Sequence, residues 1–211
     1  MRTISLFILS LFIGIAAYSQ NTPSTKSKAD EIEPYDYPTK LIGGYNILFK
    51  ADDSTEYLYL TKGNKRIAEL ASDVRGGLYK SLGYVGADFK EYFVFVHSYG
   101  SGNPHEIELI KKTTGKNILK TDAWWIDVLK KKEALLYSDQ DVPTTKDKMI
   151  LYSVSSGKKR LLSFPKDVFN EPMILYRIKI KTLTDKYLII KYDTNGHSKM
   201  KKYVFKPGYK K

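Results

Sequence analysis

Cysteine is absent from the 211 residues, and histidine and tryptophan occur only three times and twice. Without cysteine, the chain can form no disulfide bond, carries no acylated lipoprotein cysteine and has no thiol nucleophile. Its stability must therefore come from a packed core. The sequence also lacks an apolar run of the roughly 20 residues that a membrane-spanning helix requires. We therefore predict no transmembrane helix in the mature chain.

The N-terminus has the three parts of a secretory signal peptide. Arg2 gives a positive start, Ile4 to Ala17 form an apolar stretch interrupted only by Ser and Gly, and Ala17-Tyr-Ser19 is a small-x-small cleavage site. The export machinery and signal peptidase require this combination. We expect cleavage after Ser19, so that residues 1–19 are removed and the mature protein is periplasmic or extracellular. An uncleaved anchor is the alternative, but the apolar stretch is short for a bilayer.

Composition divides the mature chain into three parts. Residues 20–37 are rich in Ser, Thr, Lys, Pro and acidic residues and lack apolar periodicity, which predicts a disordered tether. Residues 38–206 carry the aromatic and aliphatic runs, and residues 207–211 are a short basic tail. The middle part is long enough to bury a sizeable core. It is the predicted folded domain.

The formal net charge of +12 favours acidic partners. An acidic protein face or an anionic glycan fits an exported chain. Nucleic acid is not expected, because the protein is exported and its lysines are spread along the sequence rather than clustered. Alternatively, the lysines are simply solvated on exposed strand faces.

Past residue 40 the sequence is typical of β-strands. Short runs of Tyr, Ile, Leu, Val and Phe alternate with Gly, Asp, Asn and Lys turns, and apolar residues rarely recur at helical spacing. One pattern recurs: an apolar strand, a loop, a second strand, a turn with Gly beside Lys or Asn, and a third strand. Its four copies begin at Tyr45, Tyr92, Glu133 and Tyr187. A further strand-like run precedes each later copy: Leu78–Val85, Trp124–Leu129 and Ile174–Leu183.

This arrangement, about four repeats of four antiparallel strands, resembles exported β-propeller repeat proteins over about residues 40–206. Continuous apolar runs such as Tyr92–Val96 and Leu188–Ile190 predict strands covered on both faces. The Gly115 and Gly157 turns fit hairpins between third and fourth strands. The resemblance implies that a strand from the other terminus, here Pro38–Gly43, completes the last repeat. An up-and-down barrel or a curved sandwich is the alternative all-β fold.

The sequence predicts no catalytic residue. The Gly-x-Ser-x-Gly elbow of serine hydrolases does not occur. Ser101 and His105 would be the nearest nucleophile and base, but the surrounding segment Ser98–Asn103 has the composition of a hairpin loop. The Gly43-Gly44 and Gly76-Gly77 pairs lack the Lys and Ser or Thr of a phosphate-binding loop.

Neither a metal nor a cofactor is predicted. His97, His105 and His197 have no short ligand spacing. The acidic pairs Asp52-Asp53 and Asp139-Gln-Asp141 fall in expected loops but lack the remaining ligands of a recognised calcium loop. Ordinary turns account for them.

The adjacent Trp124 and Trp125 are the main candidates for ligand contact. Neighbouring strand residues point to opposite faces, so one ring can lie in the core while the other points outward. An outward ring near Tyr99 or Tyr137 would form an aromatic platform for a sugar or a peptide. Alternatively, both rings are buried. The candidate binding residues are Trp124, Trp125, Tyr99, His97 and His105.

These features favour an exported, non-catalytic binding or interaction module of the cell envelope or exterior. Loops at one rim of a β-scaffold would present basic and aromatic residues to an acidic protein or a glycan. One alternative is a glycan or peptide hydrolase whose acidic residues converge only in the fold. Another is a periplasmic immunity-type inhibitor that blocks a toxin. A structural component of the envelope is also compatible with the sequence.

Overall fold

The computed structural model describes residues 37–75, 82–98, 104–119, 122–139, 148–168 and 174–206. The predicted signal peptide, the tether up to residue 36 and the basic tail lie outside these ranges. All regular structure in the described residues is β-strand apart from three short 3-10 helices, which confirms the all-β class. No helix in these ranges is long and apolar enough to cross a membrane.

The strands form four successive units. The first contains β1 (Thr39–Leu41), β2 (Tyr45–Ala51), β3 (Thr55–Lys62) and β4 (Lys65–Val74). The second contains β5 (Tyr84–Asp88), β6 (Tyr92–His97), β7 (Glu106–Lys111) and β8 (Lys116–Asn117). The third contains β9 (Ala123–Leu129), β10 (Ala134–Asp139), β11 (Lys148–Ser153) and β12 (Lys159–Ser163). The fourth contains β13 (Lys179–Leu183), β14 (Tyr187–Thr194) and β15 (His197–Val204). The 3-10 helices are η2 (Lys130–Lys132), η3 (Lys166–Val168) and η4 (Ile174–Arg177).

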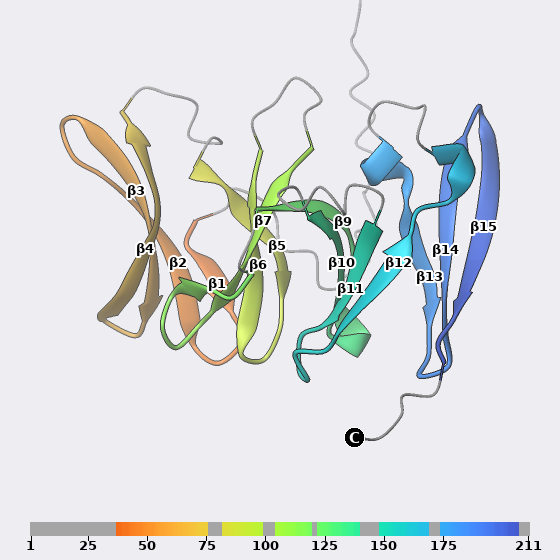
Figure 1. Ribbon diagram of the computed structural model, residues 1–211. Helices are drawn as coiled ribbons and strands as arrows, with labels where there is room; N and C mark the ends of the chain where they lie inside the picture. The colour runs from red at the N-terminus through yellow and green to blue at the C-terminus, as the bar shows by residue number, and fades with distance from the viewer. Residues whose placement is uncertain are drawn as a thin grey trace, which may run out of the picture. The chain divides into compact units, whose positions relative to one another are not determined.

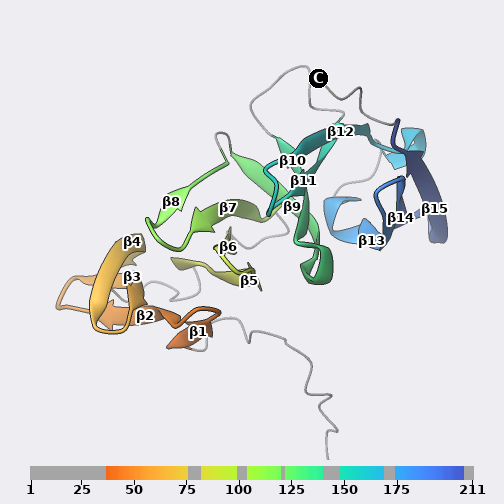
Figure 2. The same ribbon diagram turned by 90° about the horizontal axis from the view of Figure 1, so that it is seen from below.

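Consecutive strands pair antiparallel within each unit, and the four units make three open sheets (Figure 1). The first unit is a four-stranded sheet and the fourth a three-stranded one. The second and third units share an eight-stranded sheet because the outer edge of β7 is divided. Ile110 and Lys111 pair with β8, whereas Glu106 and Ile107 pair with β9. Figure 2 shows β7 and β9 side by side at this junction.

The predicted strand order is confirmed, with three corrections. Of the predicted run Leu78–Val85, residues 78–81 lie outside the described residues, and β5 begins only at Tyr84 and continues to Asp88. Residues 174–177 of the predicted run Ile174–Leu183 form η4, and β13 begins only at Lys179. The strand expected to complete the last repeat instead pairs with its own neighbour, since Leu41 of β1 lies opposite Tyr45 of β2. Gly43 and Gly44 have φ angles of +86° and +75°, which favour glycine and allow a tight hairpin.

The first strands of the last three units have a feature in common that the sequence does not reveal. Each carries one extra residue relative to the second strand of its unit, namely Gly86, Ile126 and Lys181. A bulge of this kind bends a strand and increases its twist. In all three units the bulge lies opposite the same position of the second strand.

The core consists of three clusters, each between successive units. In β6 of the second unit, Phe93 and Phe95 pack in a cluster with the first unit, while Val94 and Val96 pack in a cluster with the third. All four side chains are at most 1% exposed. The prediction that this run is covered on both faces is therefore confirmed.

In the fourth unit only one face of the sheet is covered. Along β14, Leu188, Ile190 and Tyr192 are buried in the cluster with the third unit, whereas Ile189 and Lys191 between them are only partly buried. The prediction that Leu188–Ile190 is covered on both faces is thus wrong. The physical reason is that no further sheet of the described chain packs on the outer face of this unit.

A buried ion pair of the second unit is hydrogen-bonded to the backbone of Ile42 in the first unit. The Lys112 side chain is fully buried, and its Nζ lies 2.6 Å from Asp88 Oδ1. The same ammonium donates to the carbonyl oxygens of Ile42 at 2.9 Å and Phe89 at 2.5 Å. Asp88 Oδ2 in turn accepts the Ile42 N–H at 2.6 Å. Each charge is compensated, which a buried pair requires.

Candidate functional site

The two tryptophans lie in β9 with their rings on opposite faces of the sheet. Trp124 packs against the cluster between the third and fourth units, and Trp125 against the cluster between the second and third. Both are partly buried. The Trp125 ring also covers Gly86, where a Cβ would come within 3.2 Å of it. Neither ring is a fully outward platform.

Tyr137, one of the two tyrosines proposed to extend such a platform, lies opposite Trp125 on β10 but is buried. Tyr137 is only 1% exposed and belongs to the core between the second and third units. Burial raises the pKa of its hydroxyl above the usual range. Tyr99 lies outside the described residues. A ligand-binding role for these aromatic residues stays a prediction.

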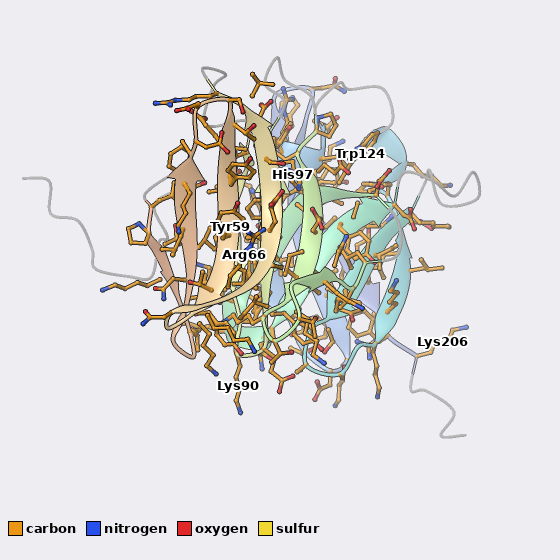
Figure 3. All side chains as sticks on the ribbon, turned by 90° about the vertical axis from the view of Figure 1, so that its left-hand side faces the viewer. Tyr59, Arg66, Lys90, His97, Trp124 and Lys206 are labelled. Carbon is orange, nitrogen blue, oxygen red and sulfur yellow. The ribbon has the colours of Figure 1, made fainter. Side chains whose placement is uncertain are left out.

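His97 ends β6 on the face directed toward the first unit. Its Nε2 lies 2.8 Å from Glu108 Oε1, and its ring packs edge-on against Phe95 at a centroid distance of 4.9 Å. Figure 3 places His97 and Trp124 toward the same end of the molecule, opposite Lys90. The pair with Glu108 joins two neighbouring strands and gives His97 a structural role.

His105 belongs to a different cluster. Its Nδ1 lies 3.2 Å from the Tyr84 hydroxyl and its Nε2 lies 3.3 Å from Ser98 Oγ. The Tyr176 ring of η4 packs against the imidazole at 5.2 Å. Burial lowers the pKa of His105, which favours the neutral ring that donates one hydrogen bond and accepts another.

In this cluster His105 pairs with Ser98, whereas Ser101 lies outside the described residues. A serine nucleophile needs a histidine base oriented by a third group, usually a carboxylate that stabilises the imidazolium. Here the third group is the Tyr84 hydroxyl. Burial disfavours the charged imidazole that proton transfer would require. The arrangement therefore fits a structural contact in which His105 of the second unit packs against Tyr176 of η4.

Among the described residues, no group of three or more His, Asp or Glu side chains could hold a metal ion. His97 and His105 do not converge, because they contact Glu108 and Ser98 on opposite faces of the second unit.

The charge distribution is the feature that sequence reasoning missed. Residues 174–206 contain nine Lys or Arg and two Asp or Glu, whereas residues 37–75 contain six and five. The lysines are spread along the sequence, as expected, but the excess of basic over acidic residues is largest in the fourth unit. Counting the charged residues of each structural unit, rather than looking for consecutive lysines, would have found the excess of positive charge in the fourth unit.

The outer face of the last sheet, defined by six residues, combines cations with exposed apolar side chains. Its members form three cross-strand pairs between β14 and β15: Tyr187 with Val204, Ile189 with Lys202, and Lys191 with Met200. Met200 and Val204 are 73% and 72% exposed. Lys202 Nζ lies 4.4 Å from the centre of the Tyr187 ring, a distance at which the ammonium is attracted to the ring face.

No protein-family model matches this chain, and the comparison with curated proteins finds no relative.

Proposed function

We propose that the protein is an exported, non-catalytic interaction module that binds an acidic protein through the outer face of the last sheet. The observation that carries this proposal is the β14–β15 register, which alternates lysines with exposed apolar side chains on one uncovered surface. This unit also holds most of the positive charge excess of the chain.

The apolar residues favour a protein partner over a glycan. Large apolar side chains that are exposed together mark surfaces that become buried on association. Met200 and Val204 supply such area, and Tyr187 adds an aromatic ring of the kind enriched at interfaces. Lys191 and Lys202 would select an acidic face and accelerate its approach. An immunity-type inhibitor acting on an acidic toxin is one form of this function.

Export and the finer fold assignment belong to the same proposal. The charged start, apolar stretch and cleavage site of residues 1–19 support export. Four successive antiparallel meanders, three of which share a bulge in the first strand, support a propeller-like repeat. Mass spectrometry of the protein from a secreting host should give a mature N-terminus at Gln20, and an intact Met1 would contradict export.

The proposal is tested with the mature chain, residues 20–211, immobilised and exposed to an envelope extract at low and moderate salt. The variant Lys191→Glu/Lys202→Glu reverses two charges on the proposed surface. The matched control, Lys50→Glu/Lys65→Glu, reverses two exposed charges on the first unit. Circular dichroism should show that both variants are folded.

We expect a discrete acidic protein that the wild type and the control retain and that the variant on the last sheet loses. Titration calorimetry with that protein, once identified, should give at least about tenfold weaker binding for the variant and a dissociation constant that rises with salt. Equal retention by the variant would overturn the proposal, as would a retained partner that is a glycan. Turnover of a glycan or a peptide by the mature chain would favour the hydrolase alternative instead.

A further inference from the structure

A small cavity lies at one end of the packing between the third and fourth units. Its volume is about 120 Å³. Most of the side chains on its wall are polar. Those used below are Lys132, Ser153, Lys158, Arg160 and Asp185, and Ala134 is one of the apolar residues of the wall. Because Ala134 is short, the space at this end of the interface is not filled by core side chains.

The backbone fixes two of the cations at the cavity. Lys132 ends η2, and the following Glu133 is left-handed with φ +44° and closes the turn by donating its N–H to the Lys130 carbonyl at 3.0 Å. The Glu133 carbonyl then accepts the Val154 N–H at 2.7 Å. Lys158 lies in the β11–β12 hairpin, which contains Val154, and its carbonyl accepts the Ser153 N–H at 2.9 Å.

The third cation comes from β12. Arg160 pairs with Leu151 of β11, and its guanidinium lies 4.2 Å from the centre of the Phe205 ring. Stacking on the ring holds the guanidinium while its N–H groups in the plane stay free to donate. The preceding Lys159 pairs with Tyr152 and has its Nζ 5.9 Å from that ring, on the other face of the strand.

The charges around the cavity are not balanced within the described part of the chain. No carboxylate there lies within 4 Å of the Lys132, Lys158 or Arg160 nitrogens, and Asp185 is the only acidic residue on the wall. Three cations and one carboxylate leave a charge of +2. Ser153 Oγ accepts a hydrogen bond from Ser156 Oγ at 2.8 Å, so the Ser153 proton is available to another acceptor.

We propose that this cavity binds a tetrahedral dianion, namely phosphate or a phosphate monoester. A dianion neutralises the +2 charge of the wall, whereas a ligand with a single carboxylate would leave a charge of +1 uncompensated. The cations come from three different segments, namely η2, the β11–β12 hairpin and β12, and a tetrahedral group has enough oxygens to accept a charge-assisted hydrogen bond from each. The site is separate from the outer face of the last sheet and does not depend on the function proposed for that face.

The first test is titration calorimetry of the mature chain with sodium phosphate at about pH 7.5, at constant ionic strength set with sodium chloride. We expect saturable binding that weakens at least about tenfold in the variant Lys158→Gln/Arg160→Gln. The control Lys159→Gln removes a charge from the same hairpin on the other face and should bind as the wild type does. Absence of saturable binding in the wild type, or equal binding in both variants, overturns the proposal.

Changing the pH and the anion sharpens the test. The dianion takes up a proton at about pH 7 in inorganic phosphate and at about pH 6 in a phosphate monoester. The affinity for inorganic phosphate should therefore fall at least about tenfold between about pH 7.5 and about pH 5.5, while that for sulfate, a dianion throughout, should change little. A parallel loss for both anions would overturn the dianion requirement. Equal or tighter binding of a sugar phosphate than of inorganic phosphate would identify an ester on a larger ligand, and binding of inorganic phosphate alone would identify the free ion. The Lys191→Glu/Lys202→Glu variant should retain phosphate binding, which separates this site from the docking surface.

Discussion

Strands β6 and β14 hold the same position in their units, yet their side chains are buried in different ways. All four residues from Phe93 to Val96 in β6 are buried, whereas buried and partly buried residues alternate along β14. The second unit has a neighbour on each face, and the fourth has one only on its inner face. The same meander therefore gives a continuous apolar run inside the array and an alternating one at its end.

The comparison shows where the protein is stabilised and where it is free to bind. Inner units contribute both sheet faces to the core, so their substitutions act on stability. The end units keep one face uncovered, and their outer residues can change with little cost to folding. The four predictions below probe this difference, from the largest expected effect to the smallest.

Replacing Val94 by aspartate should abolish folding. The side chain is fully buried between the second and third units, and an unpaired charge there costs as much as the whole stability of a typical domain. We expect no soluble folded protein in circular dichroism and gel filtration. Leu48→Asp, on the outer face of β2, should cost only about 1 kcal/mol. A soluble, cooperative Val94→Asp protein would show that β6 has an open face.

Replacing Lys112 by methionine should destabilise the protein by about 3–5 kcal/mol, because it leaves the Asp88 carboxylate buried without its cation. Denaturant unfolding measures this loss. The exposed pair of Arg66 and Glu69 on the first unit provides the comparison, and Glu69→Gln should cost less than about 1 kcal/mol. Equal losses of stability for the two variants would argue that the ion pair of Lys112 and Asp88 is no more important than an exposed one.

Two hairpin glycines should respond differently to alanine. Gly115 and Gly196 have φ angles of +68° and +75°, so alanine strains either turn by about 1–2 kcal/mol. A Cβ at Gly115 would also overlap the Ala68 Cβ in the first unit, whereas nothing lies within 4 Å of one at Gly196. Thermal unfolding should therefore show a further loss of about 1 kcal/mol or more for Gly115→Ala. Identical losses would mean that the two units do not pack at this hairpin.

The smallest expected effect is a pH dependence from His105. Burial lowers the pKa of this imidazole in the folded state, so the unfolded chain takes up a proton first as the pH falls below about 6.5. The stability contributed by the neutral ring is present above that pH and is lost as the pH falls through the folded pKa. Between about pH 7.5 and about pH 5, the melting temperature of the wild type should fall more steeply than that of His105→Gln. Parallel curves would contradict this assignment.

The sequence predicts the strands well because their signals are local. Continuous apolar runs, glycine turns and the strand before each repeat are all visible in the chain, and β6 and the Gly115 and Gly157 hairpins are as expected. The prediction that Pro38–Gly43 completes the last repeat is wrong, because the Gly43-Gly44 turn lets β1 pair with β2. A local hairpin of this kind requires less loop-closure entropy than pairing with a distant strand.

The candidate sites are less accessible to sequence reasoning. Trp124 and Trp125 are correctly placed on opposite faces, but how far neighbouring units cover each ring depends on packing between residues distant in sequence. The proposed phosphate cavity is lined by members of two basic triplets, Lys130–Lys132 and Lys158–Arg160. Only the β10–β11 register, in which Ala134 lies opposite Ser153, brings these triplets together. A run of lysines does not reveal which of its members shares a face with another run.

The divided edge of β7 also bears on how a protein of this design could change length. The second and third units share one hydrogen-bonded ladder at that edge, while among the described strands no ladder joins either of them to the first or the fourth. Losing an end unit would uncover a packed surface but break no strand pairing, and an added unit would find a ready face to cover. Removing or inserting a unit at the β7–β9 junction would cut a sheet. Deleting an end unit should therefore disturb the remaining sheets less than deleting a unit at the β7–β9 junction.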